Sequence, residues 1–130
     1  MEKVLIVDDD SVIRGVLRLY VEQLDCIVIE ASNGKIALDI LYDNPSMNAV
    51  ITDLMMPVMH GREFIKILRG HDMFKKVPIL VVSAVEKYET VKDLIDLGAS
   101  SFIPKPFQQD QIVAFLKLVL PSLRNSPSAA

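Results

Sequence analysis

The sequence has a single cysteine, no long hydrophobic run and no excess of basic charge, and each of these shortages excludes a class of protein. Cys26 alone cannot form an internal disulfide, and in an apolar segment it is expected to be a small core residue. No apolar run approaches the roughly 18 residues that a membrane-spanning helix requires. The net charge is −3 and the basic residues are scattered, so no basic face is available for a nucleic acid backbone. We therefore expect neither membrane insertion nor direct binding of nucleic acid.

A secretory signal is also missing, because only four apolar residues follow Met1-Glu2-Lys3 and no small-residue cleavage site comes after them. This predicts a cytoplasmic protein. A chain of 130 residues is long enough for one domain that buries about two thirds of its unfolded surface. We expect that domain to span residues 1–123, with residues 124–130, rich in Ser, Pro and Ala, as a flexible tail or the start of a linker.

Short apolar runs alternate five times with segments of helical spacing. The runs cover residues 3–7, 26–31, 49–52, 79–82 and 101–103. Because these runs do not alternate between apolar and polar residues, both faces of the sheet that they form should be covered. Helices are expected after each run, the last from about Gln109 to Leu120. The pattern predicts an α/β fold with a single five-stranded, doubly wound parallel sheet and five helices.

Two of the expected helices carry a stripe beyond the one that faces the core. On the first, a charged stripe that we expect to face solvent is formed by Arg14, Arg18, Glu22 and Asp25. The last helix has more apolar residues than one core-facing stripe needs, namely Ile112, Val113, Phe115, Leu116, Leu118, Val119 and Leu120. This excess suggests a surface for a partner or a homodimer. The alternative, that all of these residues are core, stays open.

Polar side chains follow four of the five strands at the point where each strand ends. They are Asp8, Asp9 and Asp10 after the first, Asp53 after the third, Ser83 after the fourth and Lys105 after the fifth. Parallel strands all end at one edge of the sheet, which is where ligands bind in such folds. Two carboxylates about 5 Å apart repel by roughly 3 kcal/mol at an effective dielectric near 20, so the acids need counter-charges. Lys105 and a divalent cation would provide them.

The chemistry of this group favours magnesium and phosphoryl transfer. Hard oxygen donors without a nearby imidazole or thiolate suit Mg²⁺ and disfavour zinc. A carboxylate nucleophile, a hydroxyl, an ammonium and Mg²⁺ around one point are the groups that position a phosphoryl group and neutralise its oxygens.

Four motifs resemble the receiver domain of two-component response regulators: Val-Asp-Asp-Asp-Ser at 7–11, Asp-Leu-Met-Met-Pro-Val-Met-His-Gly at 53–61, Ser83-Ala84 and Lys105-Pro106-Phe107. The resemblance covers about residues 3 to 120 and implies a flavodoxin-like fold and a phospho-accepting signalling domain rather than an enzyme. It implies a sensor histidine kinase or a phosphotransfer protein as the phosphodonor, and a downstream protein partner. His60 stands where the family often has an acid, and we interpret it as an exposed loop residue.

The resemblance also implies a role for each site residue. Asp53 would accept the phosphoryl group, and Mg²⁺ would bind between Asp9, Asp53 and the backbone carbonyl of Met55, with Asp8 assisting. Ser83 and Lys105 would contact the phosphoryl oxygens, with a cis peptide bond between Lys105 and Pro106. Ser83 and Phe102 would form the switch, and the helix from Glu86, Phe102 and the last helix would form the switching face. The apolar Met55 and Val85, which flank the path of the hydrolytic water, predict slow loss of the phosphoryl group.

The main alternative is an enzyme. Asp8-Asp9-Asp10-Ser11-Val12 after an apolar strand also fits the Asp-x-Asp-x-Val motif of haloacid-dehalogenase-type phosphatases, in which Asp8 would be the nucleophile and Asp10 the acid. Those enzymes need a second acidic cluster after a later strand, and none follows residues 79–83. A flavin-binding module is disfavoured because no Gly-rich or Ser/Thr-rich phosphate loop follows the first strand.

Overall fold

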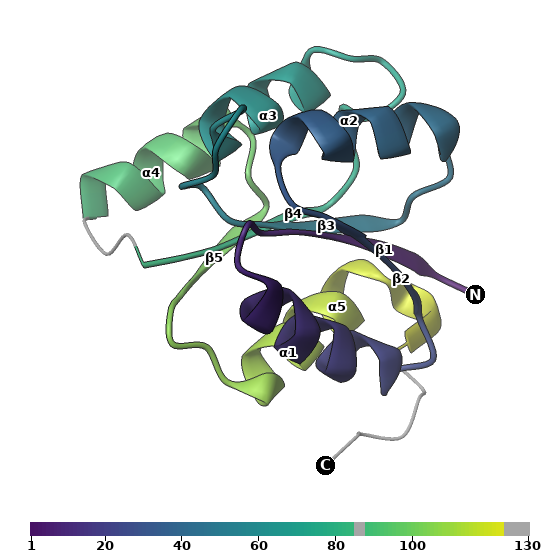
Figure 1. The fold of residues 1–130 in the computed structure, drawn as a ribbon. Helices are drawn as coiled ribbons and strands as arrows, with labels where there is room; N and C mark the ends of the chain where they lie inside the picture. Colours follow the sequence, from purple (N-terminus) through teal and green to yellow (C-terminus); the bar gives the residue numbers. More distant parts are fainter. Residues whose placement is uncertain (85–87, 124–130) are drawn as a thin grey trace.

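The computed structural model describes residues 1–84 and 88–123 and forms a three-layer α/β sandwich (Figure 1). Five parallel strands lie in the order β2-β1-β3-β4-β5. In chain order the elements are β1 (Lys3–Val7), α1 (Ser11–Glu22), β2 (Ile27–Ala31), α2 (Gly34–Asp43), β3 (Ala49–Thr52), α3 (Gly61–Arg69), β4 (Ile79–Ser83), α4 (Tyr88–Leu97), β5 (Ser101–Pro104), α5 (Gln109–Val119) and the 3₁₀ helix η1 (Pro121–Leu123). The predicted fold class is confirmed. The expected tail at 124–130, Val85 and Glu86 lie outside the described residues.

The sheet separates two hydrophobic cores. Helices α1 and α5 cover one face, and α2, α3 and α4 cover the other (Figure 1). Successive residues of β1 point to opposite faces, so Leu5 and Val7 join the core under α2 to α4, while Val4 and Ile6 join the core under α1 and α5. All four are at most 1% exposed. This two-sided burial is the reason why β1 is apolar from Val4 to Val7.

Polar residues at the carboxyl edge of the sheet begin three of the helices. Asp10, Asn33 and His60 are the N-caps of α1, α2 and α3, and each side chain accepts a hydrogen bond from a backbone N–H of the first turn. Helix α4 ends at Leu97, and the next residue, Gly98, has φ = 131°, a conformation that favours glycine. The chain turns there into β5.

The apolar excess of α5 is largely core. Ile112, Phe115, Leu116 and Leu120 are buried, and Val113 and Val119 pack partly against the same core. Leu118 is the exception at 68% exposed. Because most of the excess is already buried, the apolar argument for a partner on this face rests on Leu118 alone.

Within the described residues, every helix is too short or too polar to cross a bilayer.

Candidate functional site

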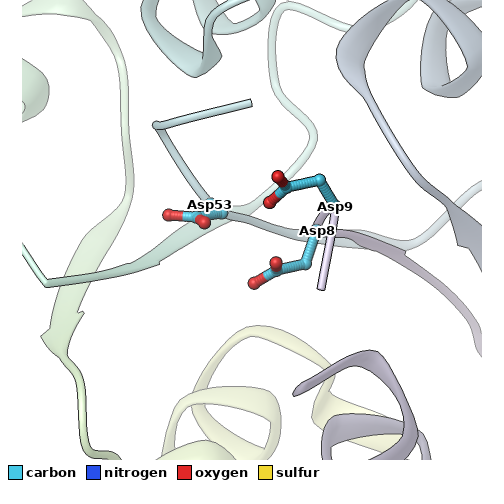
Figure 2. A group of neighbouring side chains, drawn as sticks. All are labelled: Asp8, Asp9 and Asp53. Carbon is cyan, nitrogen blue, oxygen red and sulfur yellow. The ribbon is translucent and has the colours of Figure 1, made fainter. Parts of the chain in front are cut away.

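Three carboxylates from neighbouring strands meet at the carboxyl edge of the sheet (Figure 2). Asp8 and Asp9 directly follow β1, and Asp53 directly follows β3. Each offers a carboxylate oxygen, and these oxygens all lie within 4.8 Å of one another. Asp8 and Asp53 are 1% and 7% exposed, whereas Asp9 is open to solvent. The group therefore has two buried members and one accessible member.

Asp8 is fixed through all four of its polar groups. Its N–H donates to the Ala31 carbonyl at 3.1 Å, and its own carbonyl accepts from Arg14 Nη1 at 2.7 Å. The carboxylate accepts from Asp10 N at 2.9 Å and from Lys105 Nζ at 3.0 Å. Burial raises the pKa of Asp8, and the hydrogen bonds from Asp10 and Lys105 only partly offset that effect.

Asp53 lies in a loop that is tied to the start of α3. Its carboxylate accepts from Leu54 N at 2.7 Å and from Lys105 Nζ at 3.2 Å. Its backbone carbonyl accepts from the buried Thr52 hydroxyl at 2.8 Å. Gly61 N donates to the Leu54 carbonyl at 2.8 Å, which closes the loop between β3 and α3. Val58 in this loop has φ = 70°, a strained conformation for a β-branched residue, so the loop is held by its contacts rather than by local preference.

Lys105 bridges the two buried acids. The cis peptide bond between Lys105 and Pro106 is present as predicted. The Lys105 N–H donates to the Ser83 carbonyl at 2.9 Å, which ties the residue to the end of β4. Burial opposes the charge of the ammonium, but the bond to Asp8 and the negative charge of Asp53 outweigh it, and the pKa of Lys105 is raised. The residue is therefore a permanent cation in the site.

The other predicted site residues lie around this centre. Ser83 ends β4 and is 1% exposed. Phe102 in β5 is half-buried against the core under α2 to α4. Met55 is 65% exposed.

The sequence interpretations of two residues that precede helices need correction. Asp10 does not belong to the carboxylate group, because its side chain caps α1 by accepting from Val12 N at 2.9 Å and Ile13 N at 3.3 Å. His60 is half-buried rather than an exposed loop residue, and its Nδ1 accepts from Arg62 N at 3.1 Å to cap α3. Both residues precede a helix, and the free N–H groups of a first turn compete for any nearby acceptor.

The sequence reasoning missed a charged network behind Asp8. Arg14 was expected to face solvent, but its side chain is only 19% exposed, and its Nε donates to Glu30 at 3.1 Å. Arg18 Nη1 also donates to Glu30, at 2.7 Å. The bond from Arg18 is the main reason why the pKa of Glu30 is lowered, so Glu30 is ionised. The signal available in the sequence was Glu30 itself, because a charge inside an apolar strand needs a partner.

The donor set fits a divalent cation. Three carboxyl groups share the single ammonium of Lys105 here. All of the donors are hard oxygens, which Mg²⁺ and Ca²⁺ prefer over the nitrogen and sulfur ligands typical of zinc. The geometry thus supports cation binding next to an accessible carboxylate at a strand end.

The pKa of Asp8 leads to a prediction about stability. Because the pKa of Asp8 is raised in the folded state, folding favours the protonated side chain. The stability contributed by this group therefore falls as the pH rises from about 3.8, the ordinary pKa of an aspartate, through the higher pKa of the folded state. Without a metal, Asp8→Asn should therefore be more stable than wild type at pH 7, by roughly 0.5–2 kcal/mol. The asparagine oxygen can still accept from Asp10 N. Urea unfolding in the presence of a chelator measures the difference.

A matched control for this prediction is Asp39→Asn, which removes the same charge from an exposed ion pair with Lys35. Its effect should stay within about 0.5 kcal/mol. The advantage of Asp8→Asn should also shrink as the pH is lowered toward 4. A less stable Asp8→Asn protein at pH 7 would contradict the argument.

Comparisons with known proteins agree with this geometry. The family profile of the response regulator receiver domain matches residues 4–117. The two-component response regulator ORR11 of Oryza sativa subsp. indica is 31% identical over 118 residues, which cover 91% of this chain and 80% of that protein. The transcriptional regulatory protein SrrA of Staphylococcus aureus is 33% identical over 91% of this chain, which spans about half (47%) of SrrA. The solved structure of the chemotaxis protein CheY4 of Vibrio cholerae has a TM-score of 0.85 and 32% identity, and covers 92% of this chain and 99% of its own.

These findings decide between the two readings of the acidic motif at residues 7–12. The relatives are response regulators, the matched family covers nearly all of the sheet and its helices, and nothing supports the haloacid-dehalogenase alternative. The chain belongs to the family of response regulator receiver domains.

Proposed function

We propose that this receiver domain accepts a phosphoryl group on Asp53 from the phosphohistidine of a sensor histidine kinase or phosphotransfer protein, in a reaction that requires Mg²⁺. The observation that carries the proposal is the bridge of Lys105 Nζ to Asp8 at 3.0 Å and to Asp53 at 3.2 Å beside the exposed Asp9. The bridge supports the proposal because a carboxylate that could act as the nucleophile, a positive charge and hard oxygen donors lie close together there. We also propose that the transfer takes place in the cytoplasm, where the sequence predicts this chain to lie.

The transfer forms one bond and breaks one. A carboxylate oxygen of Asp53 attacks phosphorus, the bond from phosphorus to the donor nitrogen breaks, and that nitrogen keeps the electron pair and takes a proton. Lys105 is within reach of the Asp53 oxygen, so its ammonium can neutralise a phosphoryl oxygen that arrives there. The hydroxyl of Ser83 would contact another. The residues that would hold Mg²⁺ are Asp8, Asp9, Asp53 and the carbonyl of Met55, and the ion would neutralise further charge on the phosphoryl oxygens.

The proposed switch connects this site to the side of the sheet next to α4 and α5. Ser83 and Phe102 lie on neighbouring strands, with Val81 paired to Phe102 and Ser83 to Pro104. Movement of the Ser83 hydroxyl toward a phosphoryl group would free space that the half-buried Phe102 ring can occupy. Partners would then bind the surface formed by α4, β5 and α5, on which Leu118 is exposed.

The phosphodonor would approach over α1. An apolar groove of about 400 Å³ lies beside Lys105 and is lined by Ile13, Val16, Tyr20, Lys105, Pro106 and Phe107. On the same helix Val12 and Leu19 are 71% and 56% exposed. Exposed apolar area next to a reaction centre suits a protein donor, because the phosphohistidine must be brought to Asp53 by a docked domain.

We also infer that the phosphoryl group is lost slowly. The exposed Met55 side chain offers no strong hydrogen bond to a water beside Asp53, and a lost hydrogen bond costs about 1 kcal/mol or roughly a factor of five to ten in rate. The second residue of this prediction, Val85, lies outside the described part of the chain.

The proposed function is tested by treating the full chain with a small phosphodonor such as acetyl phosphate, with Mg²⁺ or with an excess of chelator. Intact mass should show one added phosphoryl group with Mg²⁺ and almost none with chelator, because the acidic group then lacks its counter-ion. Borohydride trapping followed by peptide mapping should locate the group on Asp53. Equal labelling in chelator, or trapping on Asp8, would refute the proposal.

A further inference from the structure

We propose that Arg14 is a positioning residue for the cation site, which it serves by fixing the peptide that joins Asp8 to Asp9. The inference rests on the proposed binding of Mg²⁺ and adds a residue to that site. Arg14 lies in α1, and its hydrogen bonds are to Glu30 and to the Asp8 backbone, not to the carboxylate of Asp8 or Asp9. Its Nη1 instead donates to the Asp8 backbone carbonyl at 2.7 Å.

The Asp8 carbonyl needs a side-chain donor because the parallel pairing of β1 with β2 ends just before it. The pairing of β1 with β2 runs to Val7 and Ala31, and the last backbone bond is from Asp8 N to the Ala31 carbonyl. The next acceptor is the carbonyl of Asp8. Because a buried carbonyl is normally paired, the Arg14 guanidinium takes the place of the missing strand.

This bond sets the direction of Asp9. The Asp8 carbonyl and the Asp9 N–H belong to one planar peptide, so holding the oxygen fixes the plane from which the Asp9 side chain departs. Asp8 itself has three other anchors, at Ala31, Asp10 and Lys105. Asp9 is exposed, and its carboxylate oxygen is nevertheless within 4.8 Å of those of Asp8 and Asp53.

Arg14 is itself held in place. Its Nε donates to Glu30 in β2 at 3.1 Å, and Glu30 also accepts from Arg18 Nη1 at 2.7 Å. The guanidinium fork thus joins the edge strand β2 to the loop after β1. Partners behind a set of metal ligands typically change metal affinity by about 10 to 100-fold when they are removed.

The test compares Arg14→Met with Arg18→Met in the full chain, with Mg²⁺ alone as the probe. Both changes remove one positive charge from α1 and one bond to Glu30, but only Arg14→Met removes the bond to Asp8. If charge alone mattered, losing a cation near the site would tighten Mg²⁺ binding. We expect instead that Arg14→Met weakens Mg²⁺ about 10-fold, measured by calorimetry, while Arg18→Met stays within about twofold of wild type.

A second variant and a metal-free measurement make the result decisive. Glu30→Gln keeps both arginines and loosens the fork, so its Mg²⁺ affinity should fall between wild type and Arg14→Met. In the metal-free protein the amide order parameter of Asp9 should drop from about 0.85 toward 0.6 in Arg14→Met and not in Arg18→Met. This measurement also separates the two proposals, because it holds even if the wild-type chain binds no Mg²⁺. Unchanged or tighter Mg²⁺ binding in Arg14→Met, equal losses in both arginine variants, or an unchanged Asp9 amide would each overturn the inference.

Discussion

Asp53→Asn is expected to gain no phosphoryl group from any donor that labels the wild-type chain. An amide is a poor nucleophile and cannot form the acyl phosphate, so the loss should be complete within the detection limit of intact-mass analysis. The fold should survive, because the asparagine oxygen can still accept from Leu54 N and Lys105 keeps its bond to Asp8. Removing one of two buried like charges also relieves repulsion between Asp8 and Asp53.

The matched control is Asp10→Asn. It removes the same charge from the same acidic motif, but Asp10 acts as the N-cap of α1, and asparagine caps a helix about as well as aspartate. Asp10→Asn should therefore be labelled at close to the wild-type rate. Labelling of Asp53→Asn at the wild-type level would show that another residue accepts the group, and loss of labelling in both variants would show that the acidic stretch acts as a whole.

Gly61→Ala is expected to have the largest effect on folding and on the site together. A Cβ at Gly61 would lie 2.5 Å from the Asp53 carbonyl oxygen and 2.7 Å from Leu54 Cα. Both are backbone atoms of the loop that carries the acceptor, so the clash cannot be relieved by turning a side chain. Overpacking of this kind costs about 1–3 kcal/mol, and relief by moving the loop would displace Asp53 from Lys105. Urea unfolding and the rate of labelling by acetyl phosphate measure the two effects.

Gly15→Ala is the control for this substitution. Gly15 lies in the middle of α1, and nothing lies within 4 Å of the Cβ that alanine would add. Alanine is favoured over glycine in an exposed helix by about 0.5–1 kcal/mol, so this variant should be more stable than wild type. The same chemical change is thus expected to shift stability in opposite directions. A Gly61→Ala protein with wild-type stability and labelling would mean that the loop after β3 accommodates the methyl group.

The layout of the fold followed from local patterns. Uniformly apolar runs such as residues 4–7 and 79–82 predict strands that are buried on both faces, and a parallel sheet follows from the helices between them. Once that sheet was predicted, Asp8, Asp53, Ser83 and Lys105 had to share one edge, because parallel strands all end on the same side. The contacts of Lys105 with Asp8 and Asp53 agree with that expectation.

The tertiary structure decided how individual side chains on that edge are used. Asp10 looks like a fourth acid in the sequence, but the free N–H groups at the start of α1 bind its carboxylate. The sequence predicts that Arg14 faces solvent. In the structure its side chain instead binds the Asp8 carbonyl, which has no partner on a neighbouring strand, and the carboxylate of Glu30. The need for glycine at position 61 depends on how closely α3 approaches the Asp53 carbonyl.

The sequence by itself therefore determined the sheet, the order of its helices and the strand ends that carry the site, because these depend on hydrophobic periodicity along short segments. Only the tertiary structure decided that most apolar residues of α5 are core, that Asp10 is a cap and that Arg14 holds the loop after β1. Each of these depends on a contact between segments that are brought together by folding. The competition between a helix end, a strand end and solvent for one polar group is settled by that three-dimensional arrangement and not by the local pattern.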